Sequence, residues 1–69
     1  MKLPERLKEL RTERNLRQED IAAALRLSLS AYCRYEQGKR EPTASVLENI
    51  ADYYNVSVDY LLGRRNRRK

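Results

Sequence analysis

The sequence contains no histidine, tryptophan or phenylalanine, and it has a single cysteine, Cys33. One cysteine cannot form an internal disulfide, and the lack of histidine removes the usual ligand spacings of metal sites. The sequence also offers no nucleophile–base pair and no credible acid–base dyad. We therefore expect no enzymatic activity, no metal and no cofactor. The lone thiol fits a reducing compartment, so we expect a cytoplasmic protein.

Long apolar runs are also missing. No N-terminal stretch has the length of a signal peptide, and no segment approaches the roughly 20 apolar residues of a membrane span. No segment alternates apolar and polar residues for long enough to predict a strand. The chain has 69 residues, of which 41% are hydrophobic, so we expect one small all-α domain with a core near the lower limit for independent folding.

Charge is distributed unevenly along the chain. Residues 1–63 contain ten Lys or Arg and ten Asp or Glu, so the net charge of +5 comes from residues 64–69. Residues 14–40 contain six cations and three anions, whereas residues 42–63 contain three anions and no cation. Such polarity is typical of a molecule that presents one surface to a polyanion. We expect a domain over residues 3–63, followed by a basic tail that is disordered.

Apolar periodicity and capping residues predict five helices. Their expected ranges are about 4–14, 18–25, 28–38, 43–54 and 57–63, with Ser28, Thr43 and Ser57 as N-caps. The second helix follows Arg17, which lacks the acceptor oxygen of a good N-cap and should cost that helix about 1 kcal/mol. The predicted fold is an all-α bundle of five short helices.

The second and third predicted helices have the layout of a helix-turn-helix, in which the second helix of the pair can enter the major groove of DNA. Helical spacing places Tyr32 and Tyr35 on the side of the third helix that packs inward, together with Ala31. The four residues expected on its outward, base-reading side are Leu29, Ser30, Cys33 and Arg34.

These four side chains differ in what they can do. Arg34 is the strongest candidate, because a guanidinium can bond O6 and N7 of guanine together; a phosphate contact or a plain surface charge is the alternative. Ser30 can donate or accept a hydrogen bond, and Leu29 can pack on a thymine methyl group. Cys33 is interpreted as a small neutral residue beside the DNA in preference to a redox sensor.

Phosphate contacts are expected on both sides of the third helix. Gln18 stands at the start of the second helix, where its amide can bond a phosphate and brace neighbouring side chains. Arg17 adds a positive charge beside it. Lys39, Arg40 and the backbone amides around Thr43 form a second candidate phosphate clamp, with a chance basic turn as the alternative.

The sequence resembles the Cro/Xre-type, phage-repressor-like helix-turn-helix family over nearly its whole length. The matching segments are Leu16-x-Gln18-Glu19-x-Ile21-Ala22, Leu27-Ser28, Arg34-Tyr35-Glu36-x-Gly38-Lys39-Arg40-x-Pro42 and Asn55-Val56-Ser57-Val58-Asp59-Tyr60-Leu61-Leu62. The resemblance implies five helices, with Gln18 on the DNA backbone, positions 29, 30 and 34 facing bases, and positions 39 and 40 on phosphates. It also implies a structural ion pair between Arg11 and Glu36.

Two residues depart from the family pattern. The family usually has glycine in the turn of the motif, where this chain has Arg26, and a Ser or Thr cap where it has Arg17. An arginine held at positive φ costs about 1–2 kcal/mol unless the turn takes another shape. Both arginines add positive charge near the expected DNA surface.

The resemblance implies a DNA-binding transcription regulator of a prokaryote or phage, a repressor by preference. It would bind a palindromic operator as a dimer. The apolar residues expected to form the dimer contact are Val58, Tyr60, Leu61 and Leu62. The alternative is a protein-interaction module on the same fold, such as an antitoxin or a coactivator, because fold alone does not determine function.

Overall fold

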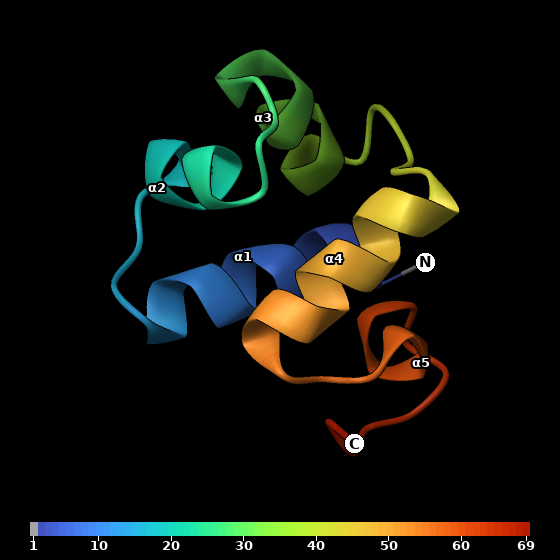
Figure 1. Ribbon diagram of the computed structural model, residues 1–69. Coiled ribbons are helices and arrows are strands. Elements are labelled where there is room, and N and C mark those ends of the chain that lie inside the picture. The colour runs from blue at the N-terminus through green and yellow to red at the C-terminus, as the bar shows by residue number, and fades with distance from the viewer. Residues whose placement is uncertain (1) are drawn as a thin grey trace.

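The computed structural model describes residues 2–69, and those residues form helices without any strand. The helices are α1 (Leu3–Glu13), α2 (Gln18–Ala24), α3 (Leu29–Gln37), α4 (Ala44–Tyr54) and α5 (Val58–Leu61). In Figure 1, α2 and α3 lie together at the top, α1 runs beneath them, α4 crosses in front, and α5 lies at the bottom with the C-terminus. The predicted all-α, five-helix architecture is confirmed.

The helix ends follow from the residues at their boundaries. The hydroxyls of Ser28, Thr43 and Ser57 each accept a hydrogen bond from the backbone N–H three residues later. Left-handed residues end the helices, because that conformation turns the chain away from the helix axis. These residues are Asn15 (φ 56°), Arg26 (φ 59°), Gly38 (φ 74°), Asn55 (φ 57°) and Gly63 (φ 80°).

The N-terminus of α2 is capped in a way that the sequence analysis missed. Arg17 provides no side-chain acceptor, but its backbone N–H donates to Asp20 Oδ2 at 2.8 Å. This contact is one half of a capping box, in which the third helical residue bonds back to the cap. Asp20 therefore compensates in part for the poor N-cap.

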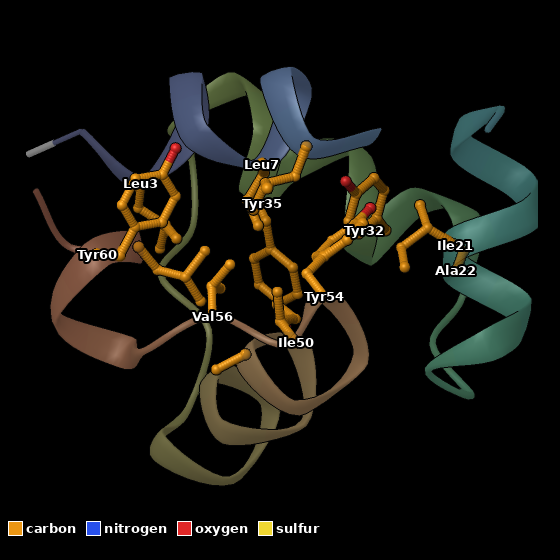
Figure 2. Packing of buried hydrophobic residues seen from close by; sticks show 13 residues of the cluster. Leu3, Leu7, Ile21, Ala22, Tyr32, Tyr35, Ile50, Tyr54, Val56 and Tyr60 are labelled. Carbon is orange, nitrogen blue, oxygen red and sulfur yellow. The ribbon is translucent and has the colours of Figure 1, made fainter. Parts of the chain in front are cut away.

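The core lies where the apolar stripes of the helices meet. The largest fully buried side chains are Leu7, Ile21, Tyr32, Ile50 and Leu61. Figure 2 shows the buried residues of α1, α3, α4 and α5 gathered in the middle, with the α2 residues at one side. α3 packs against both α1 and α2, so the orientation of α3 depends on these two contacts.

The structure corrects the expected dimer surface. Tyr60 and Leu61, assigned from the sequence to a dimer contact, are buried at 4% and 0% exposure, and the Tyr60 hydroxyl donates to Glu9. α5 has only four residues and lies against α1 and α4, so these two side chains complete the protomer's own core. Of the predicted contact residues, Val58 and Leu62 remain half-buried at the surface.

The basic tail, expected to be disordered, has a defined course that folds back onto the body. The backbone N–H of Ser57 donates to the Arg68 carbonyl at 2.6 Å. The Arg68 guanidinium donates to Glu13 and lies 5.5 Å from the centre of the Tyr60 ring. Arg65 lies 3.7 Å from an Asp59 oxygen. Carboxylates and an aromatic ring of the body thus offset the charge that favours disorder in the isolated tail.

Among residues 2–69, no helix has both the length and the apolar character needed to cross a bilayer.

Candidate nucleic-acid interface

The turn between α2 and α3 keeps a tight conformation even though it contains Arg26. This residue has a φ of 59°, in the left-handed region that glycine occupies at little cost. The turn is closed by a hydrogen bond of 2.8 Å from the Leu27 N–H to the Ala22 carbonyl. Ala22 is 2% exposed, so a small side chain allows the backbones of α2 and the turn to approach closely.

α3 has a buried side and an exposed side. Tyr32 and Tyr35 are 0% and 4% exposed and anchor the helix in the core. Leu29 is 47% exposed, and Arg34 is also exposed. Together with the exposed Ser30, these residues form an outward surface on which an apolar side chain stands beside a cation. Cys33 differs from them because it is half-buried.

Gln37 belongs to the exposed side of α3, and the sequence analysis did not include it. It lies three residues after Arg34 and four after Cys33, so it continues the same helical surface. A side-chain amide can bond either a phosphate or an adenine edge. The spacing alone was sufficient to find it. Gln37 also occupies the last turn of α3, next to Gly38.

Behind this surface, Glu36 is the centre of a hydrogen-bond network that joins three helices. Arg11 Nε donates to Glu36 Oε2 at 2.7 Å, and Arg11 Nη2 donates to Oε1 at 3.2 Å. The Tyr32 hydroxyl donates to Oε2 at 2.6 Å, and Gln18 Nε2 donates to Oε1 at 3.2 Å. Arg11 also donates to the Leu16 carbonyl at 2.9 Å. The pair implied by the resemblance thus lies within a larger network.

The electrostatics of this network keep Glu36 ionised. Its side chain is only 4% exposed, and burial by itself raises the pKa of a carboxyl group. Hydrogen bonds from Arg11, Tyr32 and Gln18 outweigh burial, so the pKa of Glu36 lies below its ordinary value. Burial and the bond to this carboxylate raise the pKa of Tyr32 well above its ordinary range, so the phenol stays protonated. Glu36 is therefore a structural anion that accepts hydrogen bonds.

Gln18 connects this network to the exposed side of α3. The Gln18 side chain is half-buried, with Nε2 bonded to Glu36 and Oε1 lying 3.3 Å from Cys33 Sγ. Beside it opens a notch of about 460 Å³. The notch is lined by Lys8, Arg11, Arg17, Gln18, Glu36 and Gln37. The expectation that the Gln18 amide braces neighbouring side chains agrees with these two contacts to α3.

The candidate phosphate-binding cations are not equally available. Lys39 and Arg40 are exposed, and neither forms an ion pair with any residue of the described part of the chain. Arg17 lies 2.9 Å from Glu19 and 3.4 Å from Asp20, so two carboxylates already compensate its charge. Thr43 accepts from the Val46 N–H as the N-cap of α4, which leaves its hydroxyl hydrogen available.

These arrangements match a known family. A family model described as helix-turn-helix matches residues 7–61. The chain belongs to this family. The resemblance to Cro/Xre-type regulators noted from the sequence is thereby confirmed, and α2 and α3 are the two helices of the motif.

Curated relatives of this helix-turn-helix chain include proteins named as regulators of transcription. The HTH-type transcriptional regulator DdrOP3 of Deinococcus deserti is 44% identical over 90% of this chain and 48% of that protein. The cryptic phage CTXphi transcriptional repressor RstR of Vibrio cholerae is 41% identical over 93% of this chain and 57% of that protein. The HTH-type transcriptional activator BcrR of Enterococcus faecalis is 39% identical over 90% of this chain and 30% of that protein. The chain thus spans about half the length of the first two relatives and less of the third.

Proposed function

We propose that this chain binds operator DNA by placing α3 in the major groove and thereby regulates transcription in the cytoplasm. The exposed side of α3 supports this proposal most directly. Leu29 and Arg34 are exposed there although neither is needed for the core, while two buried tyrosines on the opposite side fix the helix. A helix anchored in this way presents its outward side chains at a constant angle to the groove.

In this proposal, different residues position the protein and select the sequence. Arg34 bonds a guanine edge, Leu29 packs on a thymine methyl group, and Ser30 bonds a neighbouring base. Lys39 and Arg40 contact phosphates on one side of the groove, with the Thr43 hydroxyl, and Gln18 does so on the other. Arg17 contributes less, because Glu19 and Asp20 compensate its charge.

We further propose that two copies bind a two-fold symmetric operator, with one α3 in each of two successive major grooves about 34 Å apart. Val58 and Leu62 are the half-buried apolar residues of the α5 region that support a contact between copies. Occupation of an operator excludes polymerase from an overlapping promoter, so repression is the proposed outcome. One relative is named as a transcriptional activator. A reporter assay should therefore be able to detect an increase as well as a decrease in transcription.

Selection of bound duplexes from a random pool tests the proposal. We expect a preferred sequence with two related half-sites separated by one helical turn. Arg34→Ala should relax preference at one position of each half-site, at a cost of about 1–3 kcal/mol for the best site. A pool that shows no enrichment at low salt would contradict sequence-specific binding. Enrichment of single half-sites would instead contradict the proposed dimer.

A further inference from the structure

The side chain of Gln18 has only one orientation that satisfies both of its neighbours. Its Nε2 lies 3.2 Å from Glu36 Oε1, and its Oε1 lies 3.3 Å from Cys33 Sγ. An ionised carboxylate accepts hydrogen bonds and cannot donate them, so the amide nitrogen must face Glu36. The amide oxygen therefore faces Cys33, and the S–H group is the donor in that contact.

One N–H group of Gln18 remains available for a ligand. The amide of Gln18 has two N–H bonds, and one of them is used by Glu36. The other forms no hydrogen bond within residues 2–69, and Gln18 is still partly open to solvent at the notch beside Lys8 and Gln37. Cys33 has only one hydrogen to donate, and Gln18 accepts it. A base facing Cys33 would find no donor.

We propose that Cys33 is a positioning residue that acts through Gln18. Its thiol holds the oxygen of the Gln18 amide while Glu36 holds the nitrogen, and the two contacts together keep the remaining N–H directed toward a phosphate of the DNA backbone. This inference rests on the proposed function, because the phosphate belongs to the operator. It replaces the expectation that Cys33 contacts a base. In this proposal α3 makes contacts on two sides: Arg34 bonds the bases, and Cys33 bonds Gln18 of α2.

A double-mutant cycle tests the coupling. Cys33→Ala removes the donor, so we expect it to weaken binding to every duplex by about two- to tenfold, the usual worth of one neutral hydrogen bond. Cys33→Ser is the matched control, because its hydroxyl restores a donor at the same position, and it should bind within about twofold of the original chain. The variant with both Gln18→Ala and Cys33→Ala should bind no more weakly than Gln18→Ala alone, because the thiol acts only through the amide.

Three outcomes would overturn the inference. Cys33→Ala could bind as tightly as the original chain, could change the preferred base at one position of the selected site, or could add its full effect to that of Gln18→Ala. The last two results would restore Cys33 as a residue that contacts a base. Thermal unfolding of each variant separates loss of binding from loss of the fold.

A measurement on the protein without DNA keeps this inference separate from the proposed function. The two side-chain amide protons of Gln18 differ in environment, because one is bonded to Glu36 and the other is not. In Cys33→Ala the bond to Glu36 remains but the amide oxygen loses its contact, so we expect both proton resonances to shift while they stay distinct, whereas Cys33→Ser should retain the original pair. Unchanged resonances in Cys33→Ala would contradict the contact, whether or not the chain prefers any DNA sequence.

Discussion

Three cations of α3 and the turn after it face solvent, whereas two arginines of the C-terminal tail face carboxylates. Arg34, Lys39 and Arg40 are exposed and form no ion pair with the residues that the structure describes. Arg65 and Arg68 each lie within 4 Å of a carboxylate oxygen of the body. The two regions also lie at opposite ends of the view in Figure 1.

This difference shows that the position of the excess charge in the sequence does not by itself indicate which cations are already compensated by carboxylates. The whole net charge of +5 comes from residues 64–69, but carboxylates at positions 9, 13 and 59 compensate part of it. On α3 itself, the one carboxylate, Glu36, is buried and is used by Arg11. Exposed cations without an ion-pair partner within residues 2–69 therefore occur in both regions, Arg67 in the tail being one, and Lys39 and Arg40 differ from it in lying beside the exposed side of α3.

The two regions also differ in the depth of their ion pairs. Arg11 and Glu36 are 13% and 4% exposed, whereas Arg68 and Glu13 are 45% and 43% exposed. Breaking a buried pair leaves one charge without a partner and without water, while an exposed pair competes with solvent from the start. The stability of the fold should therefore be more sensitive to mutation of the Arg11–Glu36 pair than to mutation of the Arg68–Glu13 pair.

Glu36→Ala should give the largest effect on stability. It leaves the Arg11 guanidinium and the Tyr32 hydroxyl without their acceptor, so we expect the free energy of unfolding to fall by about 3–5 kcal/mol. Urea denaturation monitored by circular dichroism measures this change. Glu36→Gln is the control, since it retains acceptor capacity for Arg11 and should lose less. A loss below about 1 kcal/mol for Glu36→Ala would mean that the network adds no more than a surface ion pair does.

The pH dependence of stability should report the ionisation of Glu36. The pKa of Glu36 in the folded state lies below its ordinary value of 4.5, so its ionised form stabilises the fold above that pH. Stability from this group should be lost as the pH falls from 4.5 through the lower folded-state pKa. Unfolding measured between pH 7 and pH 2 should show a steeper acid loss for the original chain than for Glu36→Gln. Parallel curves would show that Glu36 does not titrate differently in the folded state.

Much of the fold could be predicted because its determinants are local. Ser28, Thr43 and Ser57 cap helices by contacts to residues three positions later, and such contacts depend only on nearby sequence. Leu7 and Ile50 lie on apolar stripes that helical periodicity makes visible. These features required no knowledge of how the helices pack.

The features that could not be predicted depend on contacts between distant segments. Nothing in the sequence around Arg68 indicates that it meets Glu13, which lies 55 positions earlier. The apolar residues around Tyr60 suggest a dimer surface, and a four-residue helix shows too little periodicity to reveal that Tyr60 is instead buried in the protomer. The hydrogen bond between Cys33 and Gln18 likewise depends on how closely α2 and α3 approach each other. Charge and periodicity indicate which residues can form ion pairs or pack in the core, but not which distant residues are in contact.

Lys39→Ala and Arg68→Ala should separate the two groups of cations in their effect on DNA binding. Removing one phosphate contact should reduce the slope of log affinity against log salt concentration by about 0.9. We expect this change for Lys39→Ala, because Lys39 has no carboxylate partner among the described residues. Arg68→Ala should leave the slope unchanged. Fluorescence anisotropy over a salt series measures the slope for both variants. An equal reduction of the slope in Arg68→Ala would indicate that the tail contacts the DNA.

Arg26→Gly should stabilise the turn of the motif. Arg26 is held at a φ of 59°, where a side chain with a Cβ is strained and glycine is not. We expect the free energy of unfolding to rise by about 1 kcal/mol, part of the gain being offset by the greater freedom of glycine in the unfolded chain. Arg26→Ala is the matched control, because it removes the same charge but keeps the Cβ. A gain of equal size in both variants would attribute the effect to charge and not to backbone strain.

Arg68→Ala should have the smallest effect on stability, although Arg68 makes more contacts than any other side chain of the tail. It bonds Glu13 and lies against the Tyr60 ring, but it is 45% exposed, so we expect a loss of about 1 kcal/mol or less. Arg67→Ala is the matched control, because its exposed side chain forms no ion pair within residues 2–69. The difference between the two variants in thermal unfolding should shrink in 1 M salt, where the Debye length is about 3 Å. Identical unfolding of the two variants at low salt would show that the Arg68 side chain adds nothing to the stability of the domain.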